Sequence, residues 1–365
     1  MNHRQARTLC LALAGFFLIV GWWPFTPFPR NRVSWLSGRH GLAFTPQGVA
    51  YDPEPLPVPV AHPSSNHAPG FAVELSLEPS NEPDNSVPHI LTIHDGRTPS
   101  GFVIAQWQSE LLLRLPAAGN PNRIREVGIP NLRRGQRHVI VISGDSIATT
   151  FYVDGRLLRR MPDFVLEPGS MRGQLILGNA ATGKSSWAGT LFGVAIFNRA
   201  LEAKDVAAHQ DLWTWGSALD LARGPGLAAL YNFAEGTGQE TRDHSPAHHH
   251  LLIPARYVVL EKTVLGGSTA LAGWSATRDI VLNVLGFVPF GFLSFRSYQG
   301  ASPARWMQPV IISTLAGTTL SLIIEVGQVW LPTRNSSLLD LFCNTAGTGI
   351  GALLADWISE SRHRG

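Results

Sequence analysis

The residues best able to do chemistry lie in an apolar stretch near the end of the chain, Leu320–Asn344. Glu325 and Gln328 stand one helical turn apart in one hydrophobic run, and Asp340 and Asn344 stand one turn apart at the start of the next. An ionisable side chain inside a membrane-length apolar segment costs roughly 2.5–3.5 kcal/mol. Because such residues persist where they face a protein interior or a polar cavity, the pattern predicts a buried polar site.

Further polar residues fall at matching positions in the neighbouring sequence. Arg334 lies in the short segment between the two runs, and Asp279 and Asn283 open an earlier apolar run, again one turn apart. Counting from the ends of the runs at 1.5 Å per residue puts all of these side chains at one depth. We therefore predict one polar cluster, made of Asp279, Asn283, Glu325, Gln328, Arg334, Asp340 and Asn344.

Three roles are compatible with this cluster. As a ligand site, it would use Arg334 for a forked contact to phosphate or carboxylate. As a catalytic site, it would use Glu325 as general base, Asp340 as its partner and Arg334 to stabilise developing negative charge. As a purely structural cluster, it would pair Arg334 with a carboxylate and join helices through amide hydrogen bonds. The sequence leaves the three open and leans against an enzyme.

The elements that must position these residues are apolar segments of membrane-spanning length. The first ends in Trp22 and Trp23, which suit a membrane interface, and no cleavage site for a signal peptidase follows it. We therefore expect a retained anchor rather than a cleaved signal peptide. The predicted spans are Leu9–Trp23, Asp279–Phe295, Met307–Leu331 and Leu338–Ile358.

The basic residues in the two terminal segments and in the loop between the second and third spans all fall on one side of the predicted spans. The positive-inside rule then makes both termini cytoplasmic and the middle of the chain extracytoplasmic. The sequence thus predicts a multi-pass protein of the cytoplasmic (inner) membrane, surrounded by membrane lipids, with the polar cluster in the outer leaflet. The flanking residues are Arg4, Arg7, Arg296, Arg305, Arg362 and Arg364.

The middle of the chain has a different sequence pattern, in which short apolar runs are interrupted by Gly, Pro, Asn and Asp. Many short strands with frequent turn signals predict an all-β sandwich. Asp154-Gly155 predicts a two-residue hairpin turn, and a helix is expected over Glu202–Leu212. The predicted domains are a tip and first span at 1–36, the sandwich at 37–256, a connector at 257–277 and a helical membrane domain at 278–365.

The sandwich resembles the laminin-G/concanavalin A-like jelly roll. The resemblance rests on FYVDGRLL, LILGN and WAGTLFGVAIFNRALEAKDVAAH, in that order along the chain. It implies an external module that binds carbohydrate or protein, here a glycan, a cell-wall polymer or an envelope protein, in some relatives through calcium. Asp95, Asp154 and Asp243 are the weak calcium candidates, although aspartate in turns more often serves the turn itself.

The helical end resembles the VanZ-like membrane family. The resemblance rests on DIVLNVLGFVPFGF and on SLIIEVGQVWLPTRNSSLLDLFCNTAGTGIGALL. It implies a cell-envelope membrane protein, with teicoplanin resistance linked to the founding type, and it transfers no catalytic role. The ligand it suggests for the polar cluster is lipid-linked or glycopeptide-like.

Other classes of protein are disfavoured. A net charge of +3 without charge blocks argues against a nucleic-acid partner. Gly178–Ser185 matches the phosphate-loop pattern, but the residues after it read as a strand rather than a helix, so no nucleotide is expected. Glu82 and Asp84 faintly resemble the spaced acids of glucanases; because Ser86 stands where a third acid is needed, hydrolysis is disfavoured.

Overall fold

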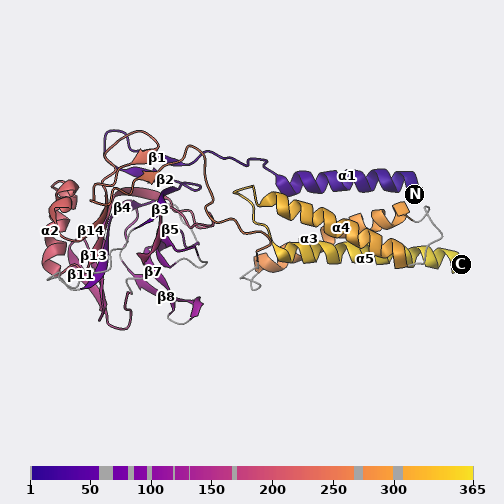
Figure 1. The fold of residues 1–365 in the computed structure, drawn as a ribbon. Helices are drawn as coiled ribbons and strands as arrows, with labels where there is room; N and C mark the ends of the chain where they lie inside the picture. Colours follow the sequence, from indigo (N-terminus) through magenta and orange to yellow (C-terminus); the bar gives the residue numbers. More distant parts are fainter. Residues whose placement is uncertain are drawn as a thin grey trace. The chain divides into compact units, whose positions relative to one another are not determined.

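The computed structural model describes residues 2–56, 69–80, 86–96, 101–117, 120–130, 132–166, 171–266, 274–298 and 307–364. The chain divides into two compact units (Figure 1). One unit is Arg30–Glu261, and the other combines Met1–Pro29 with Lys262–Gly365.

The first unit contains two antiparallel sheets. The first sheet has the order β1-β2-β13-β4-β9-β10-β11, with β14 also paired to β13. Its strands are β1 (Val33–Trp35), β2 (Leu42–Phe44), β4 (Pro69–Pro79), β9 (His138–Asp145), β10 (Thr149–Val153), β11 (Arg156–Met161), β13 (Gly189–Arg199) and β14 (Leu227–Tyr231).

The second sheet has the order β15-β16-β3-β12-β5-β6-β7-β8. Its strands are β3 (Ala50–Leu56), β5 (His89–His94), β6 (Phe102–Trp107), β7 (Glu110–Ala117), β8 (Asn120–Ile129), β12 (Gly173–Leu177), β15 (Glu240–Thr241) and β16 (Leu251–Leu252). The expected β-sandwich is therefore confirmed.

The core lies between the sheets because side chains alternate along each strand. On β4, for example, Phe71, Val73, Leu75 and Leu77 belong to the main core, while Glu74 belongs to the opposite face. The largest fully buried side chains include Trp187, Tyr231, Phe44 and Phe102.

The predicted hairpin turn is confirmed. β10 pairs with β11 in antiparallel register, with Val153 opposite Arg156. Asp154 and Gly155 have φ angles of 50° and 74°, the left-handed conformation that a two-residue hairpin loop requires at both positions.

A helix and a short 3₁₀ segment cover the outer face of the first sheet (Figure 1). They are α2 (Ala203–Thr214) and η2 (Ala218–Arg223). Val206 and Trp213 of α2 pack with Ala72, Ala195 and Phe197 of the sheet. The helix expected over Glu202–Leu212 is confirmed, with a shift of one to two residues at its ends.

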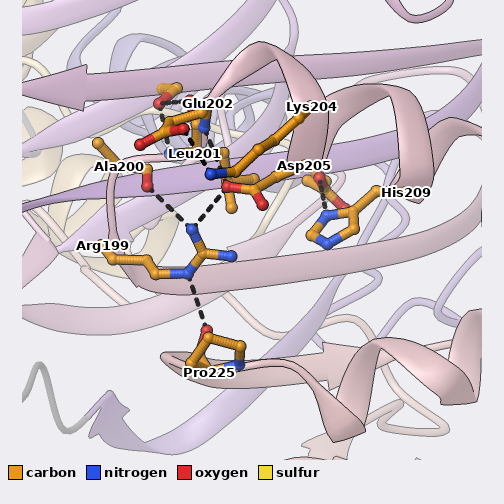
Figure 2. Close-up of polar contacts among 10 residues, drawn as sticks. Arg199, Ala200, Leu201, Glu202, Lys204, Asp205, His209 and Pro225 are labelled. Carbon is orange, nitrogen blue, oxygen red and sulfur yellow. Dashed lines mark hydrogen bonds and ion pairs between the residues drawn. The ribbon is translucent and has the colours of Figure 1, made fainter. Parts of the chain in front are cut away.

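Arg199, at the end of β13, fixes the start of α2 (Figure 2). Its guanidinium donates to Asp205 Oδ2 at 2.7 Å, to the Ala200 carbonyl oxygen at 3.2 Å and to the Pro225 carbonyl oxygen at 2.9 Å. Asp205 also accepts the backbone N–H of Glu202 at 3.1 Å, which caps the helix. Burial acts to raise the pKa of Asp205, but these hydrogen bonds outweigh it and lower that pKa.

Glu74 of β4 fixes the other end of α2 from beneath. Its side chain is fully buried, with one oxygen 2.8 Å from His209 Nδ1 and the other accepting the Trp213 indole N–H at 2.8 Å. A buried carboxylate is tolerated when both oxygens have partners. The helix is therefore held to the sheet at both ends by side chains from different strands.

The second unit is helical. Its helices are α1 (His3–Trp22), α3 (Trp274–Tyr298), α4 (Met307–Gln328) and α5 (Leu338–Arg364). Within the described part of the chain, these four are long and apolar enough to cross a membrane. The segments expected to span the membrane are thus helices.

Glycines let α5 approach its neighbours closely. A Cβ at Gly347 or Gly351 would collide with the carbonyl groups of Val284 or Val288 on α3. A Cβ at Gly291 would likewise meet the backbone of Thr348. Small residues at these positions allow the backbone-to-backbone packing that drives helix association in lipid.

The two ends of the helical unit differ in composition. At one end, His3 Nδ1 lies 3.0 Å from the Arg296 carbonyl oxygen, and Arg296 donates to Ser359 Oγ at 3.2 Å. These contacts bring the start of α1 to the ends of α3 and α5, and Figure 1 shows both termini there. At the other end, α1 and α4 finish and α3 and α5 begin; we call this the polar end.

The Arg199–Asp205 pair gives a first prediction. Asp205→Asn should destabilise the sandwich by about 2–3 kcal/mol, since it weakens a charge-assisted hydrogen bond to a buried guanidinium. The effect should shrink as the pH falls below about 4, where the wild-type carboxylate also takes up a proton. Urea unfolding followed by tryptophan fluorescence measures both.

Lys204→Ala is the matched control. Lys204 pairs with Glu202 at 2.9 Å, but both side chains are mostly exposed. Losing such a pair should change stability by less than about 1 kcal/mol. Equal losses of unfolding free energy in Asp205→Asn and Lys204→Ala would contradict the anchoring role of Asp205.

Candidate functional site

The acidic residues of the polar end are joined through the start of α5. The Glu325 carboxylate, on α4, is buried and accepts the backbone N–H of Ser337 at 2.7 Å. The Ser337 hydroxyl in turn accepts the backbone N–H of Asp340 at 3.3 Å. Asp340 Oδ1 accepts the side-chain N–H of Asn283, on α3, at 2.8 Å. One chain of hydrogen bonds thus links α4, α5 and α3.

Arg334 and Gln328 bind the end of α1 instead. Arg334 donates to the carbonyl oxygens of Trp23 at 2.9 Å and Val20 at 3.2 Å, and Gln328 donates to the carbonyl oxygen of Gly21 at 3.0 Å. The last carbonyl groups of a helix have no intrahelical partner, so these side chains supply one. The pairing of Arg334 with a carboxylate that the structural alternative needed is absent among the described residues.

The two remaining predicted residues, Asn344 and Asp279, differ in burial and in their contacts. Asn344 is buried and donates to Ser321 Oγ at 2.9 Å, while its Oδ1 atom is buried without a hydrogen-bond partner among the described residues. Asp279 is exposed, with its carboxylate 3.5 Å from Arg278. The predicted residues therefore gather at one end of the helices, but they do not form a single contact network.

This arrangement is rich in hydrogen-bond acceptors. Within the described ranges, Glu325 and Asp340 receive neutral N–H donors and no cationic partner. Arg334 keeps one guanidinium nitrogen, Nη1, that makes no hydrogen bond to the described residues. Acceptors beside a guanidinium suit a ligand that carries hydroxyl or amide donors together with one anionic group.

Pockets of two different sizes occur in the described part of the sandwich. A small one of about 150 Å³ is lined by His89, Arg114 and Glu261, among others. A larger one of about 550 Å³ lies over the outer face of the first sheet, beside the end of α2. Burial, and then the charge of Arg114, lower the pKa of His89 to about 4, so this imidazole is neutral at pH 7.

The aspartates named as calcium candidates make structural hydrogen bonds. Asp154 accepts the Val139 N–H at 2.9 Å and lies 2.9 Å from His138 Nδ1. Asp243 is buried and accepts the backbone N–H groups of Leu230, Ser245 and His249. Asp95 follows the end of β5. No group of three or more potential metal ligands occurs among the described residues.

The phosphate-loop match is a turn of the sandwich. Asn179 Oδ1 accepts the backbone N–H groups of Ala180 at 2.9 Å and Ser185 at 3.2 Å, which closes the loop on itself. The segment then runs into strand β13, and no helix follows to bind a phosphate. Glu82 and Asp84 lie outside the described residues, and so does Arg305.

Comparison with known families separates the two parts of the chain. Residues 228–359 match the VanZ/LLP1 family model. The helical region is VanZ-like. Residues 59–207 match the concanavalin A-like lectin/glucanases superfamily, so the chain carries a lectin-like sandwich between its first and second apolar helices. These features fit a membrane protein with a binding module.

Several solved structures are similar to part of this chain. A putative carbohydrate binding protein from Bacteroides ovatus is 15% identical, with a TM-score of 0.40, and the match covers 60% of this chain and 61% of that one. A SAP-like pentraxin from Limulus polyphemus is 15% identical, with a TM-score of 0.34 and coverages of 50% and 79%. The Ruminococcus gnavus IT-sialidase CBM40 bound to α2,3-sialyllactose is 12% identical, with a TM-score of 0.35 and coverages of 48% and 96%.

No curated protein matches the chain.

Sequence reasoning missed the larger pocket of the sandwich. Its polar lining comes from Arg39, His40, Glu78, Arg137 and Asn232, which are scattered over nearly the whole domain. No local motif unites them. The one local signal is the tryptophan pair Trp213 and Trp215 at the end of α2, where Trp215 is 85% exposed.

The neutral His89 gives a prediction about pH. The pKa of His89 is lower in the folded protein than the unfolded value of about 6.5, so the unfolded chain takes up a proton first. Folding stability should therefore fall as the pH drops from about 6.5 towards about 4. His89→Gln should flatten this dependence in urea unfolding curves measured at each pH.

His40→Gln is the control, because His40 is exposed. It should keep the wild-type dependence of stability on pH. An identical pH dependence in the wild type and in His89→Gln would contradict the buried, neutral state of His89.

Proposed function

We propose that this chain is a multi-pass cell-envelope protein whose external sandwich binds a glycan or a protein and whose polar end binds a lipid-linked or glycopeptide-like ligand. The observation that carries the proposal is the pair of acids at the polar end, Glu325 and Asp340. Both sit on membrane-length helices and neither has a cationic partner among the described residues. Placing two such groups in an apolar segment is costly, which supports a role beyond packing.

The distribution of charge supports the proposed topology. Arg4, Arg7, Arg296 and Arg362 lie at the end of the helical unit opposite the polar end. Arginines flanking membrane spans favour the cytoplasmic side. The polar end then faces outward. Residues 30–261 fall in sequence between the end of α1 and the start of α3, so the sandwich belongs to the same side.

The chemistry of the polar end supports a ligand with several donors. Glu325, Asp340 and the unpartnered Oδ1 of Asn344 are acceptors, which suit sugar hydroxyl groups or peptide N–H groups. Arg334 Nη1 could meet a phosphate or carboxylate of the same ligand. A lipid-linked saccharide and a glycopeptide both combine these groups.

A structural role is the second candidate, and one contact favours it. Glu325 accepts the N–H of Ser337, the residue just before α5, and a carboxylate there stabilises the start of a helix. In this alternative the acid ties α4 to α5 and binds nothing else. The enzymatic alternative, with Glu325, Arg334 and Asp340 acting together, is weaker because Arg334 contacts α1.

Acid-to-amide variants separate binding from structure. Glu325→Gln keeps an acceptor for the Ser337 N–H and removes the charge, and Asp340→Asn does the same for Asn283. Each should weaken binding of a polyprenyl-diphosphate-linked disaccharide peptide, or of teicoplanin, by about tenfold or more, the scale of one lost charge-assisted hydrogen bond. Titration of the full-length protein in nanodiscs measures the affinity, and thermal unfolding of the same samples measures stability.

Asp356→Asn is the matched control. It makes the same change on α5, about 24 Å along the helix from Asp340 at 1.5 Å per residue. It should leave binding unchanged. Variants of Glu325 and Asp340 that bind both probes like the wild type but unfold at lower temperature would replace this proposal with the structural one.

A further inference from the structure

The larger pocket of the sandwich has the features of a ligand site. We call it the α2 pocket and define it by Arg39, His40, Glu78, Arg137, Phe192 and Asn232. Its volume of about 550 Å³ lies within the range of small-molecule sites, roughly 300–1,000 Å³. The end of α2 and the residues before η2 form one wall, which the Glu74 contacts to His209 and Trp213 hold in place.

Two arginines make the pocket cationic. Arg137 donates to Ser76 Oγ at 3.0 Å and to the Trp213 carbonyl oxygen at 2.9 Å, and its guanidinium lies 4.4 Å from the ring centre of Phe192. These contacts fix its plane and leave Nη1 without a hydrogen bond among the described residues. Arg39 is exposed, and within the described ranges it forms neither a hydrogen bond nor an ion pair.

The two guanidinium groups lie close enough to repel each other. Burial, and then the charge of Arg39, lower the pKa of Arg137, while the charge of Glu78 acts in the opposite direction. Two cations and one carboxylate leave the pocket net positive. An anionic group between Arg39 and Arg137 would relieve the repulsion and use both free N–H edges.

The pocket also presents acceptors that lack donors. Asn232 Oδ1 is buried without a hydrogen-bond partner among the described residues. Leaving such an oxygen unpaired is unfavourable, so a hydroxyl or N–H group that reached it would supply the hydrogen bond it lacks. The Glu78 side chain also makes no hydrogen bond to the described part of the chain, which gives a second acceptor in the same pocket.

An exposed tryptophan lies next to lining residues of the pocket in the sequence, although it does not itself line the pocket. Trp215 is 85% exposed and lies in sequence between Thr214 and Gly216, which both line the pocket. A large aromatic ring left in water at a polar pocket favours contact with an amphipathic ligand. The apolar face of a sugar ring has this character, whereas a simple inorganic anion does not.

We propose that the α2 pocket binds an acidic sugar, with its carboxylate between Arg39 and Arg137, a hydroxyl or N–H group on Asn232 Oδ1, and its ring against Trp215. A neutral sugar would leave the two arginines uncompensated, and a free phosphate would leave the Asn232 oxygen unpaired. This inference rests on the proposed binding role of the sandwich and names both the site and the class of ligand.

The test uses matched sugars and the full-length protein in nanodiscs. The probes are oligosaccharides ending in glucuronic acid, N-acetylmuramic acid or sialic acid, each compared with its methyl ester, together with inorganic phosphate. At least one acid should bind at least tenfold more tightly than its ester, and phosphate should not compete at equal concentration. No binding by any acid, equal binding of acids and esters, or full competition by phosphate would overturn the proposal.

Variants then locate the site. Arg39→Ala and Trp215→Ala should each weaken acid binding about tenfold or more, and both should fold because the two side chains are exposed. Arg156→Ala, which removes an exposed arginine on β11, should bind like the wild type. Wild-type affinity in both Arg39→Ala and Trp215→Ala would overturn the assignment to the α2 pocket.

The test of the acidic-sugar site can be distinguished from the test of the proposed ligand site at the polar end. Arg39→Ala should bind the polyprenyl-linked probe and teicoplanin as the wild type does, because that site lies in the helical unit. If these probes bind while every acidic sugar fails, the proposed function stands and the acidic-sugar inference falls.

Discussion

Helix ends inside an apolar environment must find partners for backbone groups that the helix itself leaves unsatisfied, and the helical unit is organised by this constraint. Glu325 accepts the N–H that precedes α5, while Arg334 and Gln328 donate to the last carbonyl groups of α1. The same contacts tie α1, α4 and α5 together. Polar residues that are costly in an apolar segment thus gather at one end, where they join the helices and where we place the proposed ligand site.

The sandwich holds its helix α2 with buried charged side chains. Glu74 lies on the outer face of a sheet, where a carboxylate is tolerated because His209 and Trp213 of α2 contact its two oxygens. Arg199 fixes the other end of that helix through its hydrogen bonds to Asp205 and to the Pro225 carbonyl oxygen. Fixing α2 in this way also fixes one wall of the α2 pocket, so the same contacts stabilise the domain and shape the proposed binding site.

Local sequence signals predicted the elements well. Alternating apolar runs identified strands such as β5, and Asp154-Gly155 identified a hairpin whose φ angles match the turn type. The apolar spans and the one-turn spacing of Asp340 and Asn344 gave the helices and the end at which polar residues gather. Contacts between residues far apart in the sequence were harder to predict. Arg334 has a side chain long enough to reach several partners, and its choice of the α1 carbonyls depends on packing that spacing does not encode. The α2 pocket draws residues from Arg39 to Asn232, so no window of sequence could reveal it.

The proposed function requires the polar end to face outward, on the same side of the membrane as the sandwich. In a Cys10→Ser, Cys343→Ser background, single cysteines at Asn335 and Ser361 would report on the two ends of the helical unit, since both residues are exposed. With a membrane-impermeant maleimide and right-side-out vesicles, we expect Asn335→Cys to be labelled without detergent and Ser361→Cys only after detergent is added. Labelling of Ser361→Cys alone in the intact vesicles would contradict the account.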